Sequence, residues 1–346
     1  MPVIQHADYQ APFWLPEGHL QTIYPSVFRK VEGVNYLRER ISTHDGDFLD
    51  LDFSDYGVSI ADYGLFNEKT LIEDKEGYSI KSEIVNRKSE IVILSHGLEG
   101  DSNRQYITGM VKQFNTNGFD CLAWNFRSCS GELNQTKRFY HSGATDDLDT
   151  VIKHAISKGY QKIYLVGFSL GGNLTLKFLG EKGQNLYPEV QKAVVFSVPL
   201  HLSSSSQTIG WLYTKRFNKS LIKKIQEKSQ RYPEFQINTS NIPKIKTLKD
   251  FDDCYTSQLH GFKDAEDYYE RNSSLYFLDK ITVQTLIVNA QNDPFLSKDC
   301  FPFEKVKHLD KVHFQAPEMG GHCGFYQADY QGILWSEKRA LEWVMG

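Results

Sequence analysis

The sequence of 346 residues predicts an α/β fold built on a mostly parallel, doubly wound sheet. Short apolar runs, amphipathic segments between them and one long interruption support this fold class. The runs are typical of strands buried on both faces and cover residues 90–97, 119–126, 162–168, 192–199, 284–290 and 311–317. Apolar positions at three- and four-residue spacing predict helices at residues 105–115, 147–158, 173–182 and 333–345. Alternation of strands and helices favours right-handed crossovers and parallel pairing.

Two earlier segments predict an antiparallel hairpin near the N-terminus. Residues Tyr36–Thr43 and Phe48–Ser54 alternate charged and apolar side chains, and a short segment containing Gly46 separates them. Glycine between two alternating runs is typical of a hairpin turn. We therefore expect a hairpin with one face in contact with water.

The interval of residues 200–280 interrupts the alternation of strands and helices. It is too long for a loop in a compact domain, and its pattern is rich in helices. We expect a discontinuous core, residues 1–199 and 281–346, with a helical cap inserted at residues 200–280. Trp211, Leu212, Tyr213 and Phe217 of this cap either line a substrate channel or form the cap's own core.

Composition and charge exclude several classes of protein. Hydrophobic residues make up 40 % of the chain and aromatic residues 13 %, which is too apolar for a disordered chain. Acidic residues outnumber basic ones, 43 to 39, so no nucleic-acid partner is expected. The N-terminal segment lacks the features of a signal peptide, and the longest apolar runs are strand-sized. These observations predict a soluble cytoplasmic protein, and they indicate no particular oligomeric state.

The cysteines predict neither a disulfide framework nor a metal site. There are five of them, they are scattered, and no two form a CxxC pair. Zinc sites and disulfide scaffolds have regular, paired spacings. We expect no metal ion and no cofactor.

Ser169 is the candidate nucleophile. The sequence Gly167-Phe168-Ser169-Leu170-Gly171 lies directly between an apolar run and a helical segment, which is the context that a G-x-S-x-G nucleophile turn requires. The glycines remove side chains that would collide across the turn. The N-terminus of the following helix favours negative charge that develops nearby. The alternative is a glycine-rich connection with an incidental serine.

His322 is the candidate base for this serine, because a serine hydroxyl needs a neighbouring base to take its proton. It lies in a glycine-rich loop after the last apolar run, where a side chain can lean over the turn of Ser169. His308 and His313 lie in or next to that run, where a structural role is favoured.

Asp293 is the candidate acid that orients the histidine. It directly follows the run 284–290, and the carboxyl ends of parallel strands are where active groups gather. Its alternative role is that of a plain Asn-Asp-Pro turn residue. Asp299 and Asp310 are the competing acids, and Asp299 stays open as a rival for the position beside His322.

Leu98 and Leu170 are expected to donate backbone N–H groups to an oxyanion. Leu170 follows the candidate nucleophile, and Leu98 lies in the loop after the run 90–97. These two places supply the oxyanion hole in folds with this type of nucleophile turn. The neighbouring His96 is expected to order the loop rather than to take part in chemistry.

Two other patterns favour a structural interpretation. His141 and Asp146 have a spacing seen in some acyltransferases, but Thr145 and Asp146 also suit the cap and first turn of the next helix. Residues 215–231 carry seven bases and one acid. This stretch could contact an anionic membrane surface weakly, although an apolar stripe favours a solvated, packed helix.

Longer stretches of the sequence resemble one family. They extend from Phe13 to the C-terminal helix and are FWLPEGHLQTIYP, LSHGLEGDSNRQYI, WNFRSCSGELNQTKRFYHSGATDDL, LVGFSLGGNLTLKFLGE, FDDCYTSQLHGFKDAEDYY, NAQNDPF and GGHCGF. In these stretches the sequence resembles the YheT-like α/β hydrolases. This branch includes the mammalian abhydrolase-domain lipases and the yeast medium-chain ethyl-ester synthases. Ser128 stands where the family usually has glycine.

The resemblance implies an α/β-hydrolase fold and an esterase or lipase of lipid metabolism. It also implies that Ser169, Asp293 and His322 form a catalytic triad. We expect a serine ester hydrolase acting on short- to medium-chain acyl esters, including monoacylglycerols. An acyltransferase that passes the acyl group to an alcohol is the first alternative, since the triad is the same. A catalytically silent hydrolase fold that acts as a binding module is the second.

Overall fold

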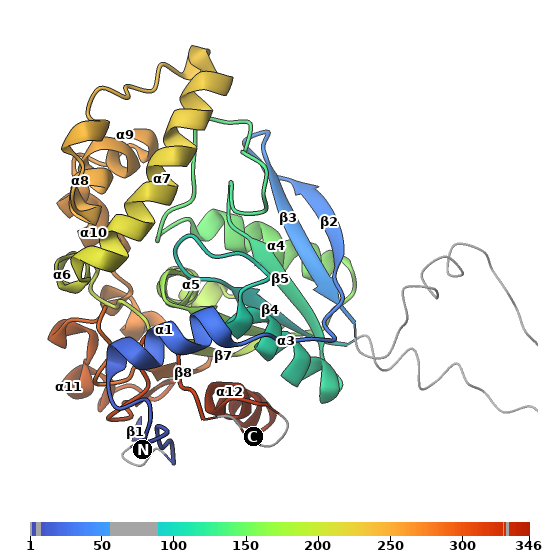
Figure 1. The fold of residues 1–346 in the computed structure, drawn as a ribbon. Coiled ribbons are helices and arrows are strands. Elements are labelled where there is room, and N and C mark those ends of the chain that lie inside the picture. Colours follow the sequence, from blue (N-terminus) through green and yellow to red (C-terminus); the bar gives the residue numbers. More distant parts are fainter. Residues whose placement is uncertain (1, 5–7, 56–88, 328, 330–331) are drawn as a thin grey trace, which may run out of the picture.

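The computed structural model describes residues 2–4, 8–55, 89–327, 329 and 332–346. Nine strands in this part of the chain form one sheet in the order β1-β9-β8-β7-β6-β4-β5-β3-β2 (Figure 1). The strands are β1 Val3–Ile4, β2 Leu37–Ser42, β3 Phe48–Ser54, β4 Glu90–Ser95, β5 Asp120–Asn125, β6 Lys162–Phe168, β7 Val190–Phe196, β8 Gln284–Val288 and β9 Val312–Gln315.

The sheet is parallel from β1 to β5 and antiparallel at its other edge. Strand β3 pairs antiparallel with both β2 and β5, and the remaining neighbours pair in parallel. The predicted α/β fold, with six buried strands and an N-terminal hairpin, is therefore confirmed. Parallel pairing brings the loops that follow β4, β6, β8 and β9 to one edge of the sheet, where ligands bind in such folds.

Helices cover both faces of the sheet. Helices α3 (Gln105–Thr116) and α12 (Trp335–Met345) pack on one apolar layer, and α4 (Thr145–Ser157) and α5 (Leu170–Lys182) pack on the other. All four predicted core helices are present, with ends shifted by a few residues. Shorter elements complete this part: α11 Phe303–Val306, η2 Gly183–Asn185 and η8 Lys298–Cys300.

The hairpin differs from its prediction in one respect, because all of β3 is buried. Arg38 and Arg40 on β2 make two hydrogen bonds each to Asp52 and Asp50 on β3, at 2.7–2.9 Å. Buried carboxylates are tolerated when they are paired in this way. The expectation of a wet face therefore holds for β2 but is wrong for β3, which lies between two other strands.

Two N-terminal elements have no counterpart in the sequence prediction. Strand β1 extends the sheet beyond β9, and helix α1 (Gly18–Phe28) lies across the edge where the loops gather (Figure 1). Helix α1 contains Pro25, and no acidic residue occupies its first turn, so the usual helix start signals are weak. Its position depends on contacts with distant loops, which are described below.

Helices fill the interval between β7 and β8 and lie to one side of the sheet (Figure 1). The division of the chain at residues 200 and 280 stays a prediction. The elements are α6 Leu202–Thr208, α7 Trp211–Arg231, η3 Pro233–Phe235, η4 Ile242–Lys244, α8 Leu248–Phe251, η5 Asp252–Thr256, α9 Ser257–His260, α10 Ala265–Asn272, η6 Ser274–Tyr276 and η7 Leu278–Lys280.

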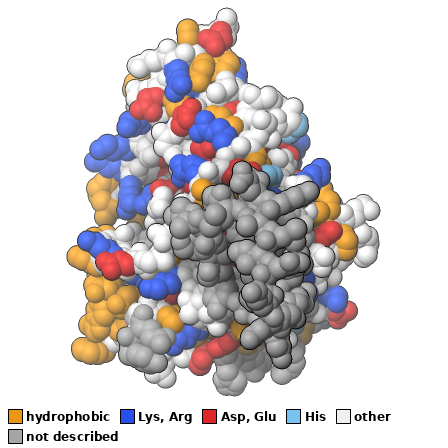
Figure 2. All heavy atoms as spheres, turned by 90° about the vertical axis from the view of Figure 1, so that its right-hand side faces the viewer, with side chains coloured by type: hydrophobic (Ala, Val, Ile, Leu, Met, Phe, Trp, Pro, Cys, Tyr) orange, Lys and Arg blue, Asp and Glu red, His pale blue; other side chains and the backbone are white. Residues whose placement is uncertain are grey.

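Basic residues gather on α7. On the face shown in Figure 2, basic and acidic side chains lie interspersed. Among the helices of the described ranges, none combines the length and the apolar composition needed to cross a bilayer.

Candidate active site

Ser169 lies in a strained turn between β6 and α5. Its backbone has φ +53° and ψ −119°, outside the regions that non-glycine residues normally adopt. Its N–H donates to the Phe196 carbonyl on β7 at 2.9 Å, and its carbonyl accepts the N–H of Asn173 on α5 at 3.0 Å. Strain of this kind persists where the surroundings over-determine it, and it is common at active sites.

The glycines around Ser169 are required by close backbone approaches. A Cβ atom at Gly171 would lie 2.4 Å from the carbonyl oxygens of Ser95 and His96, and one at Gly167 would lie 2.7 Å from the Gly171 carbonyl. A Cβ at Gly172 would lie 2.7 Å from the Val198 side chain. The glycines therefore let α5 begin directly against β4 and β6, with Ser169 at its N-terminus.

The structure brings Ser169, His322 and Asp293 together in one chain of hydrogen bonds. The Ser169 Oγ lies 2.9 Å from His322 Nε2, and His322 Nδ1 lies 2.9 Å from Asp293 Oδ2 and 3.1 Å from Oδ1. The Phe295 N–H donates to Asp293 Oδ1 at 2.9 Å, and the Phe295 ring stacks on the imidazole at 4.0 Å between centroids. Asp293 thus holds the edge of the imidazole and the Phe295 ring packs on its face, and together they direct Nε2 toward Ser169.

The competing residues lie elsewhere. The side chain of Asp299 is 59 % exposed, and its Oδ2 lies 4.0 Å from His201 Nδ1. His313 lies on β9 and contacts the Trp343 ring. Of the two acids left open by the sequence, only Asp293 contacts His322 within the described residues.

The electrostatic surroundings favour a proton on His322. Burial lowers the pKa of the imidazole, but the Asp293 carboxylate outweighs burial, so the pKa of His322 lies above its usual value of 6.5. A raised pKa strengthens the imidazole as a base, because the protonated form is stabilised by the adjacent carboxylate.

Leu98 and Leu170 line the same cleft as Ser169. Leu170 is the first residue of α5, so its N–H has no acceptor within the helix. On either side of Leu98, the Gly97 N–H donates to the Tyr106 hydroxyl at 3.0 Å and the Glu99 N–H donates to the Tyr140 hydroxyl at 2.9 Å. Two tyrosines therefore hold the loop that carries the Leu98 N–H.

His96 is bound to the backbone of that loop. Its Nε2 accepts the Phe126 N–H at 3.1 Å, and its Nδ1 lies 2.8 Å from the Gly97 carbonyl. Burial lowers the pKa of His96 to about 3, so the ring is neutral and Nδ1 carries the proton. These bonds agree with the expected ordering role.

Glu99, which the sequence analysis missed, joins this loop to helix α7. It adopts a left-handed backbone with φ +54°, and its side chain is buried. Its carboxylate accepts hydrogen bonds from Lys224 Nζ at 2.8 Å, from the Tyr140 hydroxyl at 2.7 Å and from the Ser220 hydroxyl. The loop that carries Leu98 is therefore tied to the helices of residues 202–280.

Helix α1 holds the loop of His322 through two side chains that were also missed. The Thr22 hydroxyl accepts the His322 N–H at 2.8 Å. The Gln21 side chain is buried, and its Oε1 accepts from the Gly320 N–H at 2.7 Å and from Asn292 Nδ2 at 3.1 Å. The segment GHLQT was part of the family resemblance, but no spacing rule links it to His322, 300 residues away.

Removing the Gln21 amide should destabilise the protein. Gln21→Leu leaves the Gly320 N–H, the Asn292 amide and the Leu15 carbonyl, to which Gln21 Nε2 donates at 2.7 Å, without their partner. Each unpaired buried polar group costs about 1–3 kcal/mol, so we expect the free energy of unfolding in urea to fall by about 3 kcal/mol. Gln191→Leu, at an exposed position, is the matched control and should unfold like the wild type. Equal urea midpoints for the two variants would contradict this role.

A cleft of about 310 Å³ opens above Ser169, and we call it the Ser169 cleft. It is lined by residues of α1, of the Leu98 loop and of α7, including Ile23, Tyr213 and Phe217. Trp211 and Leu212 are instead 69 % and 64 % exposed. Of the four residues considered for a substrate channel, Tyr213 and Phe217 line the cleft, whereas the other two face solvent.

The two weaker sequence patterns have structural partners. Asp146 binds the Arg138 guanidinium at 2.6 Å in the first turn of α4, as expected of a first-turn acid. The expected cap at Thr145 is wrong, because Ala144 occupies the N-cap and Thr145 bonds to Glu181 instead. On the basic helix α7, Lys228 Nζ is directed inward to the Arg138 carbonyl at 2.8 Å. The apolar stripe of α7 packs against Phe251 and Tyr255.

Comparison with known proteins shows the family of this chain. Residues 90–329 match the family model described as the alpha/beta hydrolase fold. The chain is 30 % identical over 334 residues to YheT of Escherichia coli, described as an inferred esterase, with 94 % of this chain and 89 % of that protein covered. It is 27 % identical to a monoacylglycerol lipase of Saccharomyces cerevisiae, covering 93 % of this chain and 76 % of the lipase. Human phospholipase ABHD3 is also 27 % identical to the chain, and the match covers 94 % of this chain and 75 % of the phospholipase.

Solved structures agree on the fold. An esterase of Pyrococcus furiosus superposes with a TM-score of 0.56 at 15 % identity, covering 92 % of this chain and 96 % of that chain. An esterase of Exiguobacterium antarcticum superposes with a TM-score of 0.53 at 16 % identity, covering 90 % of this chain and 100 % of that chain. The chain therefore belongs to the α/β hydrolase fold family, in its YheT-like branch, and is an esterase- or lipase-like carboxylic-ester hydrolase.

Proposed function

We propose that the protein hydrolyses short- to medium-chain acyl esters, monoacylglycerols among them, through an acyl-enzyme on Ser169. The observation that carries the proposal is the unbroken chain of hydrogen bonds from Asp293 through His322 to the Ser169 hydroxyl at the base of an open cleft. The names of the yeast and human relatives, a monoacylglycerol lipase and a phospholipase, support an acyl ester of a lipid as the substrate class.

In the first half-reaction His322 Nε2 takes the Ser169 proton while Oγ bonds to the carbonyl carbon of the ester. The carbonyl oxygen becomes an oxyanion, which the N–H groups of Leu98 and Leu170 stabilise. Collapse breaks the bond to the alcohol oxygen, which receives the proton from His322. Asp293 accepts the Nδ1–H throughout, so it fixes the tautomer and stabilises the imidazolium.

In the second half-reaction a water molecule attacks the acyl-enzyme. His322 takes the water proton and returns it to Ser169 Oγ as the acyl–oxygen bond breaks, and the carboxylic acid leaves. All protons move between Ser169, His322, water and substrate. This cycle therefore requires no metal ion or cofactor.

An alcohol that replaces water in the second half-reaction would make the protein an acyltransferase. The two activities share the acyl-enzyme and differ only in the acceptor that reaches it. A silent hydrolase fold that only binds ligands is the other alternative, and the intact hydrogen-bond chain argues against it. The cytoplasmic location and a weak membrane contact through the helices of residues 200–280 stay predictions.

A series of p-nitrophenyl esters from acetate to palmitate tests the proposal. We expect turnover with one preferred chain length and covalent labelling of Ser169 by a fluorophosphonate, detected by peptide mass spectrometry. Product analysis at graded ethanol concentrations separates the two activities. Predominant ethyl ester formation at low ethanol would favour the acyltransferase. Absence of both turnover and labelling, in a protein with a normal circular dichroism spectrum, would reject an acyl-enzyme.

A further inference from the structure

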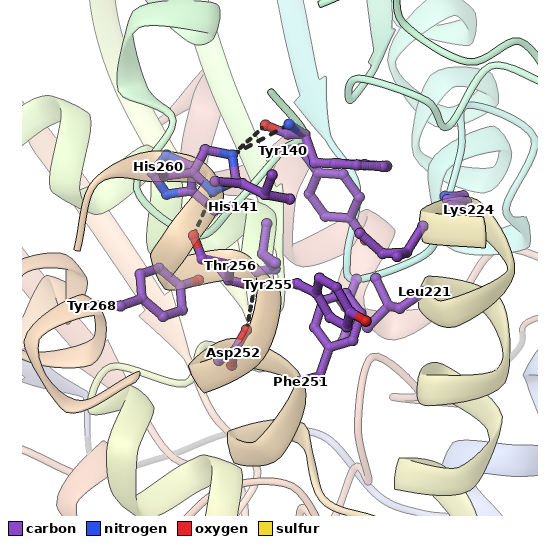
Figure 3. Close-up of a pocket in the computed structure, with 15 residues that line it drawn as sticks. Tyr140, His141, Leu221, Lys224, Phe251, Asp252, Tyr255, Thr256, His260 and Tyr268 are labelled. Carbon is purple, nitrogen blue, oxygen red and sulfur yellow. Dashed lines mark hydrogen bonds between the residues drawn. The ribbon is translucent and has the colours of Figure 1, made fainter. Parts of the chain in front are cut away.

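A second, smaller cavity adjoins the Ser169 cleft on the side of Leu98 and Leu170. Its volume is about 50 Å³, and we call it the inner cavity (Figure 3). Its walls come from the Leu98 loop, from residues 139–141 and from the helices α7, α8, η5 and α9. Five residues line both spaces, namely Leu98, Leu170, Leu221, Asp252 and Tyr268. The cleft and the inner cavity therefore meet at these residues.

We propose that the inner cavity holds the acyl chain of the ester substrate. This inference rests on the proposed function, because it takes the position of the carbonyl from the N–H groups of Leu98 and Leu170. These same two residues also line the inner cavity. An acyl chain bonded to that carbonyl carbon therefore begins at the entrance of the inner cavity.

The position of His322 determines which half of the ester, acyl or alcohol, points toward the inner cavity. The histidine must reach the oxygen of the leaving alcohol to return a proton to it. His322 lines the cleft but is absent from the inner cavity, and so are its neighbours Thr22 and Phe295. The alcohol therefore lies on the side of α1 and His322, and the acyl chain lies on the opposite side, toward the inner cavity.

The lining of the inner cavity suits an alkyl chain. Apolar residues of α7, α8 and α9 line it, namely Leu221, Ile225, Phe251 and Leu259. Figure 3 labels Leu221 and Phe251 among them. Each methylene group moved from water into such surroundings favours binding by about fourfold. Longer acyl chains should therefore bind better until the inner cavity is full.

Polar residues of the lining already have hydrogen-bond partners, and some of these partners belong to the lining itself. Asp252 accepts hydrogen bonds from the Thr256 and Tyr269 hydroxyls at 2.5 and 2.7 Å. The Tyr268 hydroxyl accepts the Ser142 N–H at 3.0 Å. His260 Nδ1 lies 2.7 Å from the Thr256 carbonyl oxygen, and its Nε2 lies 2.9 Å from the Phe139 carbonyl oxygen and 3.3 Å from the Phe139 nitrogen.

Burial also disfavours a charge on the histidines of this wall. It lowers the pKa of His260 and lowers that of His141 well below its usual value. A polar head group entering the inner cavity would lose its hydration and meet groups that are already bonded, which is unfavourable. The occupant is therefore the hydrocarbon part of the substrate rather than its glycerol or phosphate part.

Leu259 is the position at which the capacity of the inner cavity can be changed. It lines the inner cavity but not the cleft, so it is remote from the reacting atoms. Its side chain is only partly buried, so a larger group is tolerated better there than at Ile225, which is 1 % exposed. Ile222 packs in the same apolar cluster and lines neither space, which makes it the control.

The test compares kcat/KM for p-nitrophenyl esters of two to sixteen acyl carbons in the wild type, Leu259→Phe, Leu259→Ala and Ile222→Phe. We expect Leu259→Phe to move the preferred chain length at least two carbons shorter and Leu259→Ala to move it longer. Acetate turnover should stay within about twofold of the wild type in both, because an acetyl group does not reach the inner cavity. Ile222→Phe should keep the wild-type profile.

Thermal unfolding of each variant separates a change of capacity from a loss of folding. Unchanged chain-length profiles in both folded Leu259 variants would overturn the inference, while Ser169-dependent acetate turnover would leave the proposed function intact. If no ester is hydrolysed at all, calorimetric binding of straight-chain fatty acids decides the matter. Chain-length-dependent binding that is weakened more than tenfold by Leu259→Phe would support the inner cavity as the site, and equal binding would reject it.

Discussion

Ser169→Ala should lower kcat for p-nitrophenyl butyrate by about 10⁶-fold, the loss typical of a removed serine nucleophile. The variant keeps the turn, since alanine is smaller than serine and makes the same backbone bonds to Phe196 and Asn173. It loses the only atom that can form the acyl-enzyme in the proposed mechanism. Residual activity would come from the oxyanion site and substrate binding alone.

Ser157→Ala provides the matched control for this loss. Ser157 is exposed at the end of α4, and its hydroxyl donates to the His154 carbonyl. Its kcat should equal that of the wild type. If Ser169→Ala folds normally and keeps more than about one hundredth of the wild-type kcat, a loss far smaller than a missing nucleophile causes, another group is the nucleophile.

Asp293→Asn should lower kcat/KM by about 10⁴-fold, the effect seen when an asparagine replaces the acid of such a triad. An amide nitrogen that donates to Nδ1 favours the tautomer with the proton on Nε2, which cannot accept the serine proton. The side chain remains nearly isosteric, so the hydrogen bond from the Phe295 N–H to the side-chain oxygen persists. Asp299→Asn is the control, and it also tests the rival acid. We expect its kcat/KM to stay within about twofold of the wild-type value, because the Asp299 side chain is exposed.

The pH profile gives this prediction a second readout. The base must be neutral, so kcat/KM of the wild type should rise with pH through the pKa of His322. Because the Asp293 carboxylate raises that pKa, the midpoint should lie above 6.5. Asp293→Asn removes the negative charge that raises the pKa of His322, so the midpoint of its kcat/KM profile should lie at a lower pH than that of the wild type. An unchanged midpoint would mean that the ionisation seen in the profile is not that of His322.

Local patterns in the sequence were sufficient to predict several elements of the fold and of the candidate site. The strand β6, the turn at Ser169 and helix α5 are consecutive in the chain, and the close approaches at Gly171 explain why the motif takes this form. Parallel strands place their carboxyl ends at one edge, so Asp293 and the Leu98 loop could be expected near Ser169. The family model and the YheT relative confirm the fold and family that these patterns indicated.

Other features depend on contacts between residues that are far apart in the chain. Periodicity could not show that β3 is buried with its aspartates, because the arginines that pair with them act across the hairpin. Helix α1 has weak start signals, and its role comes from Gln21 and Thr22, which bond to the loop of His322.

The sequence by itself determined the order of the candidate residues along the chain: a serine in a tight turn, then an acid, then a histidine in a glycine-rich loop. It did not determine which acid meets the histidine, since Asp293 and Asp299 are both near the end of β8. The tertiary structure decided this, because the imidazole can contact only the carboxylate that the fold turns toward it. It also decided the shape of the space around Ser169, because Glu99, α7 and η5 are brought together by packing and buried hydrogen bonds rather than by any local signal.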